Sequence, residues 1–277
     1  MRSSRRRDHH DGRGAAPGIL AGMIRVCVAG ITGWVGRPVA AAIAETDDLA
    51  LVAGVARGAS GQRIADAMVS GSLAAALETP FDVLVEYTSA ETAKGHAIDA
   101  ARAGRHVVIG SSGLTTTDYD EIDAVAREQG VGVVAVGNFA MTAALLQRFA
   151  VEAAAYLPAW EIVDTASAGK RDAPSGMARE LAWRLSQVRP PETEIPVDET
   201  VGAVDARGAD IDGSRIHSVR LPGYTIGLEV RFGQADERLT ISYDAGPGAG
   251  PYIAGTLLAI RRVGSVTGLV RGLDRLL

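Results

Sequence analysis

The chain has 277 residues, of which 47% are hydrophobic and 22% charged, and its formal net charge is −5. This composition is ordinary for a globular protein with room for one large domain or two modest ones. The acidic balance argues against nucleic acid as a partner, because a phosphate backbone attracts basic surfaces. No apolar run approaches the roughly 20 residues that span a bilayer. The single cysteine, Cys27, excludes an intrachain disulfide.

Residues 1–22 differ from the rest of the chain. Their apolar part, residues 18–22, is too short for the hydrophobic region of a secretory signal. We therefore expect residues 1–22 to form a disordered tail, and we expect a cytoplasmic protein. His9 and His10 are interpreted as solvated tail residues, and no metal site is predicted.

Strands and helices alternate through the first half of the chain. Apolar β-prone runs predict strands at 24–29, 49–55, 82–87, 106–109 and 132–136. Helical spacing predicts helices at 37–45, 92–103 and 118–129. Alternation of this kind is typical of βαβ units with a parallel, Rossmann-like sheet.

The pattern changes after Asn138. Helices are predicted at 140–155, 177–187 and 252–263. Strands are predicted at 160–167, 216–221, 225–232 and 238–243. The last three strands follow one another without helices between them, which favours a mixed, mainly antiparallel sheet in an α+β domain.

A glycine-rich turn follows the first strand and precedes the first helix. Gly30, Gly33 and Gly36 let the backbone approach a pyrophosphate, which the helix N-terminus then faces. The G-x-x-G-x-x-G spacing is a variant of the dinucleotide fingerprint. The alternative is a tight strand–helix turn without a ligand. The predicted cofactor contacts in this turn are Gly30, Thr32, Gly33, Trp34, Val35 and Gly36.

The end of the second strand carries Arg57 and no carboxylate. An arginine here suits the extra phosphate of NADP, so NADPH is favoured and NADH stays possible. The alternative is that Arg57 is a solvated loop charge. Further turns would lie at the carboxyl edge of the sheet, where ligands of such folds bind. Their predicted cofactor contacts are Tyr87, Thr88, Gly110, Ser111, Ser112, Gly137, Asn138 and Phe139.

The segment from Lys170 to Gly176 predicts an anion site. A lysine precedes a Pro-Ser-Gly turn that opens a helix, and free backbone N–H groups with the helix dipole favour a carboxylate or phosphate there. The residues just upstream, 166–169, contain no titratable group. The predicted substrate contacts in this segment are Lys170, Ser175 and Gly176, and Lys170 is the predicted catalytic residue.

With these segments in this order, the chain resembles bacterial dihydrodipicolinate reductases over nearly all of residues 23–277. The Lys170–Gly176 motif is the specific part of the resemblance. It implies a dinucleotide-binding domain at 23–138 and 252–277, and a substrate-binding and oligomerisation domain at 139–251. It also implies reduction of a cyclic, dicarboxylated imine or enamine with NAD(P)H, and a homotetramer or homodimer.

Three departures from the family pattern lie in the expected substrate pocket. A His-His pair of the family is replaced by Ala166 and Ser167, and a threonine is replaced by Met177. The resemblance implies that Ser167 and Met177 are further substrate contacts. An alanine cannot transfer a proton, and general acid–base help contributes typically ~100- to 10,000-fold in rate. Lys170, Asp164, Thr165, Tyr224 or a water molecule are the remaining candidates for the proton donor.

We therefore predict an NAD(P)H-dependent reductase that acts on a C=N or conjugated C=C bond of a small carboxylated, cyclic substrate other than the family's usual one. One alternative is an authentic dihydrodipicolinate reductase of lysine biosynthesis. Another is a non-catalytic NADPH-binding sensor or partner subunit.

Overall fold

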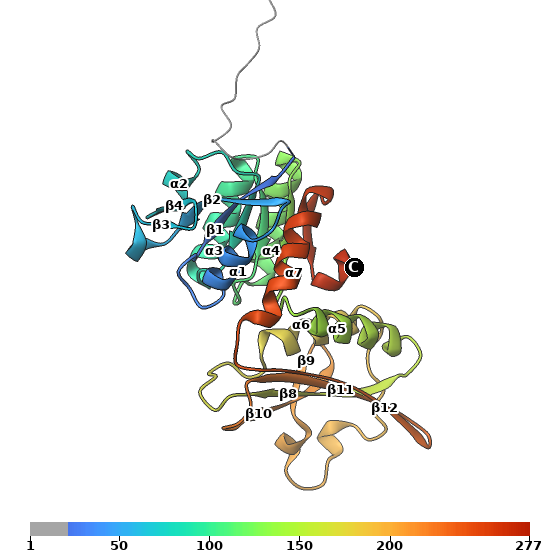
Figure 1. The fold of residues 1–277 in the computed structure, drawn as a ribbon. Coiled ribbons are helices and arrows are strands. Elements are labelled where there is room, and N and C mark those ends of the chain that lie inside the picture. The colour runs from blue at the N-terminus through green and yellow to red at the C-terminus, as the bar shows by residue number, and fades with distance from the viewer. Residues whose placement is uncertain (1–21) are drawn as a thin grey trace, which may run out of the picture.

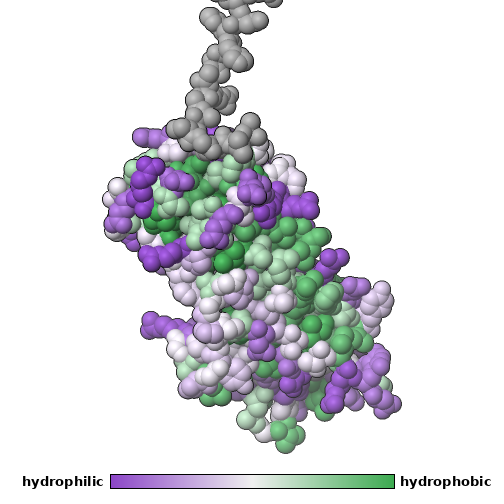
Figure 2. Space-filling view, viewed as in Figure 1, coloured by the Kyte–Doolittle hydropathy of each residue, from purple (hydrophilic) through white to green (hydrophobic). Residues whose placement is uncertain are grey.

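The computed structural model describes residues 22–277, so the tail expected at residues 1–22 lies outside the described residues except for its last glycine. Two lobes make up the molecule, and each contains one sheet (Figure 1). In the space-filling view of Figure 2 the lobes are joined by a narrower waist. Among residues 22–277, no helix has both the length and the apolar character needed to cross a membrane.

The first lobe contains an eight-stranded sheet in the order β13-β7-β6-β5-β1-β2-β4-β3. Its neighbouring strands pair in parallel, except that β3 and β4 are antiparallel. The strands are β1 (Ile24–Ala29), β2 (Leu49–Val55), β3 (Arg63–Ile64), β4 (Ala67–Ser70), β5 (Val83–Glu86), β6 (His106–Ile109), β7 (Gly132–Ala135) and β13 (Gly268–Arg271). The helices of this lobe are α1 (Gly36–Ala44), α2 (Leu73–Ala76), α3 (Ala90–Arg102), α4 (Thr116–Gln129) and α7 (Gly250–Arg262).

Helices cover both faces of this sheet because its central strands are apolar on both sides. Successive side chains of a strand point to opposite faces. In β1, Val26 and Val28 pack in the cluster that includes residues of α1 and α7, whereas Cys27 packs in the cluster that includes residues of α3 and α4. This doubly covered parallel sheet confirms the predicted Rossmann-like architecture.

The second lobe contains a five-stranded sheet in the order β12-β11-β8-β10-β9. Three of its four strand pairs are antiparallel, and β8 with β10 is parallel. The elements are α5 (Met141–Ala154), β8 (Ala159–Ala166), α6 (Gly176–Ser186), β9 (Ala209–Ile211), β10 (Ser214–Arg220), β11 (Ile226–Gln234) and β12 (Glu237–Ala245). The mixed, mainly antiparallel sheet is therefore confirmed.

Helices α5 and α6 lie on the face of the second sheet that is turned toward the first lobe (Figure 1). Their apolar side chains pack with Trp160, Ile162, Val230 and Phe232 in one core cluster. The first turn of α6 contacts the segment that joins the lobes, because Nδ2 of Asn138 donates to the sulfur of Met177 at 3.4 Å. Short 3-10 helices complete the structure: η1 (Arg57–Ala59), η2 (Val197–Glu199), η3 (Val204–Arg207), η4 (Val263–Ser265) and η5 (Leu273–Leu276).

Helix boundaries follow local capping signals in the sequence. At the start of α4, the Thr115 side chain accepts a hydrogen bond from the N–H of Asp118, whose carboxylate accepts one from the N–H of Thr115. At its end, Gly130 adopts the left-handed conformation with φ 67°. This pairing of a capping box with a C-terminal glycine fixes the ends of a helix.

Four strands and one helix were not predicted. Strands β3 and β4 and helix α2 lie between Arg57 and Phe81, and β9 and β13 are short segments in the second half of the chain. These elements have two to four residues each, which is too short for a period of 2.0 or 3.6 to show. Their formation depends on pairing with strands that are distant in the sequence.

Candidate functional site

The glycine turn after β1 folds back on itself. The N–H of Gly33 donates to the carbonyl of Gly30 at 2.8 Å, and Gly30 has φ 79°. A Cβ atom on Gly36 would lie 2.0 Å from the Gly30 carbonyl oxygen. Glycine is thus required by the turn itself. No side chain caps the start of α1. The N–H of Arg37 already donates to the carbonyl of Gly33 at 3.1 Å and Pro38 has no N–H, so the N–H group of α1 that remains available to an anion is that of Gly36.

The other predicted residues of this turn are accessible. Thr32 and Gly33 are exposed, and Trp34 is 61% exposed. The Trp34 ring packs edge-to-face on Tyr252, near the start of α7, with ring centroids 5.8 Å apart. This contact sets the Trp34 side chain beside the α7 helix, while its backbone stays in the turn.

Arg57 is exposed and follows β2 directly, as the sequence suggested. It makes no ion pair within residues 22–277. Its guanidinium can therefore bind an anion without first breaking an internal contact.

A buried carboxylate organises the ends of β5 and β6, and sequence reasoning did not single it out. Glu86 is fully buried and accepts hydrogen bonds from the N–H of Thr88 at 2.8 Å and from the Oγ of Ser111 at 3.4 Å. Its other oxygen lies 2.7 Å from Nδ1 of His96. Thr88 and Ser111, two predicted cofactor contacts, are thus oriented by one carboxylate. Only the position of Glu86 at a strand end hinted at this role.

The side chain of Tyr87 packs inside the lobe. Its hydroxyl lies 2.7 Å from Oγ1 of Thr256 on α7, and its ring meets that of Phe139 edge-on. A Cβ atom on Gly110 would overlap the Tyr87 ring at 2.0 Å. Burial raises the pKa of the Tyr87 hydroxyl. Among these predicted contacts, Tyr87 and Phe139 therefore support the loops by packing, and the Tyr87 carbonyl lies against Gly30 of the turn.

The segment after β7 joins the two lobes. Asn138 is buried; its Oδ1 accepts from the N–H of Ala140 at 2.8 Å, and its Nδ2 donates to the sulfur of Met177 at 3.4 Å. The buried Tyr243 hydroxyl lies next to Asn138 without forming a hydrogen bond within residues 22–277. Burial raises the pKa of Tyr243, and the Asn138 side chain opposes this effect.

The predicted anion turn opens α6, with Ser175 as its N-cap. The Ser175 Oγ accepts from the N–H of Ala178 at 3.3 Å, but the N–H of Ser175 donates to Oδ2 of Asp164 at 2.8 Å and is not free. The N–H groups of Gly176 and Met177 make no hydrogen bond within residues 22–277. A Cβ atom on Gly176 would meet nothing within 4 Å. The accessible part of the turn is therefore centred on Gly176.

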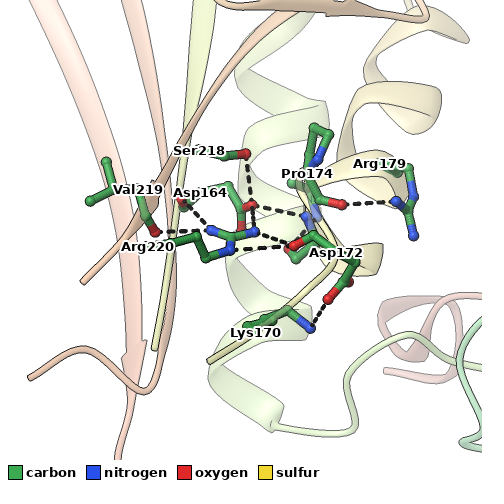
Figure 3. A network of polar contacts seen from close by, with 10 residues as sticks. Asp164, Lys170, Asp172, Pro174, Arg179, Ser218, Val219 and Arg220 are labelled. Atoms are coloured by element: carbon green, nitrogen blue, oxygen red, sulfur yellow. Dashed lines mark hydrogen bonds and ion pairs between the residues drawn. The ribbon is translucent and has the colours of Figure 1, made fainter. Parts of the chain in front are cut away.

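Figure 3 shows how the anion turn is anchored to the sheet. The fully buried Asp164 on β8 accepts from Ser218 Oγ at 3.1 Å and from Arg220 Nη2 at 2.7 Å, and Arg220 also donates to the carbonyl of Asp172 at 2.8 Å. Burial raises the pKa of Asp164, but the hydrogen bonds from Arg220 and Ser175 outweigh it and hold the pKa below its ordinary value. Asp164 is thus an ionised acceptor, so its suggested role as proton donor is wrong.

Lys170 is accessible but paired in the free protein. Its Nζ lies 2.8 Å from Oδ1 of Asp172, and 30% of its side chain is exposed. Asp172 braces the turn through its backbone carbonyl and partners Lys170 through its carboxylate.

The positions that depart from the family pattern differ in exposure. Ala166 is fully buried at the end of β8, whereas Ser167 is exposed. Met177 is buried and contacts Asn138, so its side chain packs against the cofactor loop rather than lining an open pocket. The open part of the site therefore consists of Lys170, Ser167 and the backbone at Gly176.

The histidines of residues 22–277 lie elsewhere. His96 pairs with Glu86, and His217 lies 2.8 Å from Oε2 of Glu161 on the second sheet. His106 accepts from the N–H of Gly132, and burial lowers the pKa of His106. Within this part of the chain, no three His, Cys, Asp or Glu residues are arranged to hold a metal ion.

Comparison with known proteins points to one family. The family profile described as dihydrodipicolinate reductase, N-terminus, matches residues 24–139, and the profile of its C-terminus matches residues 142–277. The chain is 36% identical to a 4-hydroxy-tetrahydrodipicolinate reductase of Syntrophomonas wolfei over 262 residues, covering 91% of this chain and 98% of the relative. It is 38% identical to the Halalkalibacterium halodurans protein of the same name, covering 92% and 100%.

A solved structure shares the whole architecture. The dipicolinate-bound dihydrodipicolinate reductase from Paenisporosarcina sp. TG-14 superposes with a TM-score of 0.78 at 29% identity, covering 92% of this chain and 100% of that one.

Proposed function

The chain belongs to the dihydrodipicolinate reductase family, and from this membership we propose that it transfers hydride from NADPH to a small carboxylated, cyclic substrate. It is an NAD(P)H-dependent oxidoreductase of that family, which argues against the non-catalytic alternative. The bond reduced would be a C=N bond or a conjugated C=C bond. The proposed domain roles are nucleotide binding for residues 23–138 and 252–277, and substrate binding for residues 139–251.

The residues present fit a pyridine dinucleotide. The turn at Gly30, Gly33 and Gly36 leaves the N–H of Gly36, at the start of α1, without a partner among residues 22–277, and a pyrophosphate would be held there. Arg57 is accessible and no carboxylate stands beside it in the chain, which supports NADPH over NADH. When bound, the nicotinamide would supply the hydride. The loops at Thr88, Ser111 and Asn138 would orient it from the carboxyl edge of the sheet.

The substrate anion would be bound at the start of α6. Lys170 is partly exposed, the N–H of Gly176 has no partner within residues 22–277, and the Asp164–Arg220 pair holds their turn in place. Lys170 would bind the substrate carboxylate and polarise the adjacent π system. Lys170 is also a candidate proton donor at this anion site.

The observation that supports a changed substrate is the fully buried Ala166 at the position of the family's first histidine. Neither Ala166 nor Ser167 can donate a proton as an imidazole does. We therefore propose a substrate other than 4-hydroxy-tetrahydrodipicolinate. The second candidate is the authentic enzyme of lysine biosynthesis, and the 36–38% identity to curated enzymes over their full length favours it.

NADPH oxidation by the purified protein separates the two candidates. One reaction would contain freshly generated 4-hydroxy-tetrahydrodipicolinate, and the others a panel of monocarboxylated cyclic imines and unsaturated acids. Turnover confined to the panel would support the changed substrate, and efficient turnover of the first compound would establish the authentic enzyme. Lys170→Ala should abolish whichever activity is found, and unchanged turnover and affinity in that variant would refute the assigned site.

A variant that restores the family residues provides an independent test. The changed substrate is attributed to the missing imidazole at position 166. If this is correct, Ala166→His combined with Met177→Thr should raise turnover of 4-hydroxy-tetrahydrodipicolinate at least roughly 10-fold. Because Ala166 is buried, thermal unfolding of this variant must first show a folded protein. Ala168→His, at an exposed position next to the pair but outside it, serves as the matched control.

We also propose a cytoplasmic homotetramer or homodimer built through the second sheet. Ile241 and Tyr243 of β12 pack in the cluster that includes α5 and α6, so Thr240 and Ser242 point to the opposite face, where both are exposed in the single chain. Light scattering coupled to size-exclusion chromatography would test it. A mass of one chain, 28.7 kDa, would contradict the proposed assembly.

A further inference from the structure

Arg179 is a second cation beside the substrate anion turn that sequence reasoning did not identify. It lies on α6, four residues after Ser175, and is exposed. Its Nη1 donates to the carbonyl of Pro174 at 2.8 Å. It has no carboxylate partner within 4 Å among residues 22–277. The Pro174 contact fixes the direction of the guanidinium and leaves most of its N–H donors unused.

Lys170 and Arg179 act on the same carboxylate in the free protein. Lys170 Nζ lies 2.8 Å from Oδ1 of Asp172. Burial raises the pKa of Asp172, but the hydrogen bond and charge of Lys170, with a smaller effect of the Arg179 charge, hold it below its ordinary value. In Figure 3 the Asp172 side chain lies between those of Lys170 and Arg179. The two cations thus lie on either side of the Asp172 carboxylate, which a substrate carboxylate would displace from Lys170.

The backbone of the same turn is also prepared for an anion. A Cβ atom on Gly176 would meet nothing within 4 Å, and the N–H groups of Gly176 and Met177 have no partner within residues 22–277. A guanidinium matches a carboxylate with two parallel hydrogen bonds, whereas an ammonium acts as a point charge. The two side chains therefore offer complementary kinds of recognition to the same group.

We infer that Arg179 is a substrate-binding residue that holds one carboxylate of the substrate together with Lys170 and the N-terminal amides of α6. This inference rests on the proposed function, because it assigns a second cation to the same site. It gives the pocket a carboxylate contact that does not use the positions of Ala166, Ser167 and Met177. The substrate class it selects is a ring with a carboxylate next to the reducible bond.

Binding of two carboxylated probes tests this inference. Dipicolinate and picolinate carry two and one ring carboxylates, and their affinities would be measured by calorimetry on the NADPH-loaded protein. Arg179→Gln should weaken both probes at least roughly 10-fold, because a charge-assisted pair to one shared carboxylate is lost. Arg179→Lys should keep an intermediate affinity, because it retains the charge without the planar fork.

The matched control is Arg171→Gln, which removes an exposed arginine beside Lys170 that forms no side-chain hydrogen bond within residues 22–277. Its probe affinities should stay within about 2-fold of the parent protein. NADPH affinity and the unfolding temperature should be unchanged in all these variants, which excludes loss of folding as the cause.

Separate outcomes would overturn the inference and the proposed function. If Lys170→Ala weakens the probes and Arg179→Gln leaves them unchanged, Arg179 is no ligand and only this inference fails. The same holds if Arg171→Gln weakens them as much as Arg179→Gln. If Lys170→Ala also leaves both affinities unchanged, or if the parent protein binds neither probe, the assigned anion site itself is wrong.

Discussion

The guanidinium of Arg184 on α6 forms two hydrogen bonds with the carboxylate of Asp274 in the C-terminal 3-10 helix, at 2.6 and 2.5 Å. Both side chains are more than nine-tenths buried. Arg184 also donates to Oε1 of Gln147 on α5. The helix that carries the anion turn is therefore fixed to the segment that follows β13, the last strand of the other lobe.

Neighbouring contacts strengthen this junction. The guanidinium of Arg271, at the end of β13, lies between the rings of Tyr119 and Trp183, 4.5 and 4.4 Å from their centroids. Glu180 of α6 accepts a hydrogen bond from the N–H of Gly137 in the cofactor loop. Together these contacts set the distance between the cofactor loops and the start of α6.

We predict that Arg184→Met lowers the free energy of unfolding by about 3 kcal/mol, because it leaves the buried Asp274 charge unpaired. Urea denaturation would measure the change. The double variant Arg184→Met/Asp274→Leu should recover part of the loss, since replacing both charges removes the unpaired group. Arg189→Gln breaks an exposed ion pair with Glu192 and should change stability by less than about 1 kcal/mol. Equal losses in the two single variants would contradict the special role of the buried pair.

Glu180 should destabilise the protein at neutral pH. Burial raises the pKa of Glu180, and its Oε1 is buried without a hydrogen-bond partner within residues 22–277. Above the ordinary glutamate pKa of about 4.3, the folded state therefore binds more protons than the unfolded state. The contribution of Glu180 to the free energy of unfolding consequently falls as the pH rises above that value.

Accordingly, Glu180→Gln should stabilise the protein at pH 8 by roughly 1 kcal/mol, the size of a buried unsatisfied polar group, and by less at pH 4.5. The glutamine keeps an acceptor for the N–H of Gly137. Thermal unfolding across this pH range would measure the difference. A variant that is less stable than the parent at every pH would show that the charged carboxylate is needed by Arg184 or Arg271.

Gly36 should tolerate no side chain. Gly36→Ala would bring a Cβ atom to 2.0 Å from the backbone oxygen of Gly30, so the turn must shift. We expect NADPH affinity to fall at least roughly 10-fold, because the free N–H at the start of α1 loses its alignment. Fluorescence titration with NADPH would measure it. Gly58→Ala is the control, since a Cβ atom at this position would meet nothing within 4 Å. The NADPH affinity of this variant should stay within about 2-fold of that of the parent protein.

Arg57 should determine the preference between NADPH and NADH. Arg57→Gln removes the cation after β2, and we expect the NADPH dissociation constant to rise roughly 10-fold while that of NADH stays the same. Arg63→Gln removes another exposed arginine of the same lobe and should change neither. An equal weakening of both nucleotides by Arg57→Gln would mean that Arg57 supports the turn instead of binding the extra phosphate.

The sequence by itself determined the features that depend on local order. The predicted strands at 49–55 and 106–109 coincide with β2 and β6, because apolar runs bounded by turns are visible within a few residues. The glycine turn and the Pro-Ser-Gly turn that opens α6 were located because each depends on neighbouring residues alone. The Lys170–Gly176 motif indicated the family for the same reason, since its specific residues are consecutive in the chain.

Only the tertiary structure decided which distant residues meet. Asp164 was suggested as a proton donor, yet sheet register places it beside Arg220, 56 residues away, where it becomes an ionised anchor. Arg184 and Asp274 are 90 residues apart, and four-residue β13 forms only because β7 offers it an edge. No local pattern encodes such pairs, because strand pairing and the packing of α6 between the lobes bring them together.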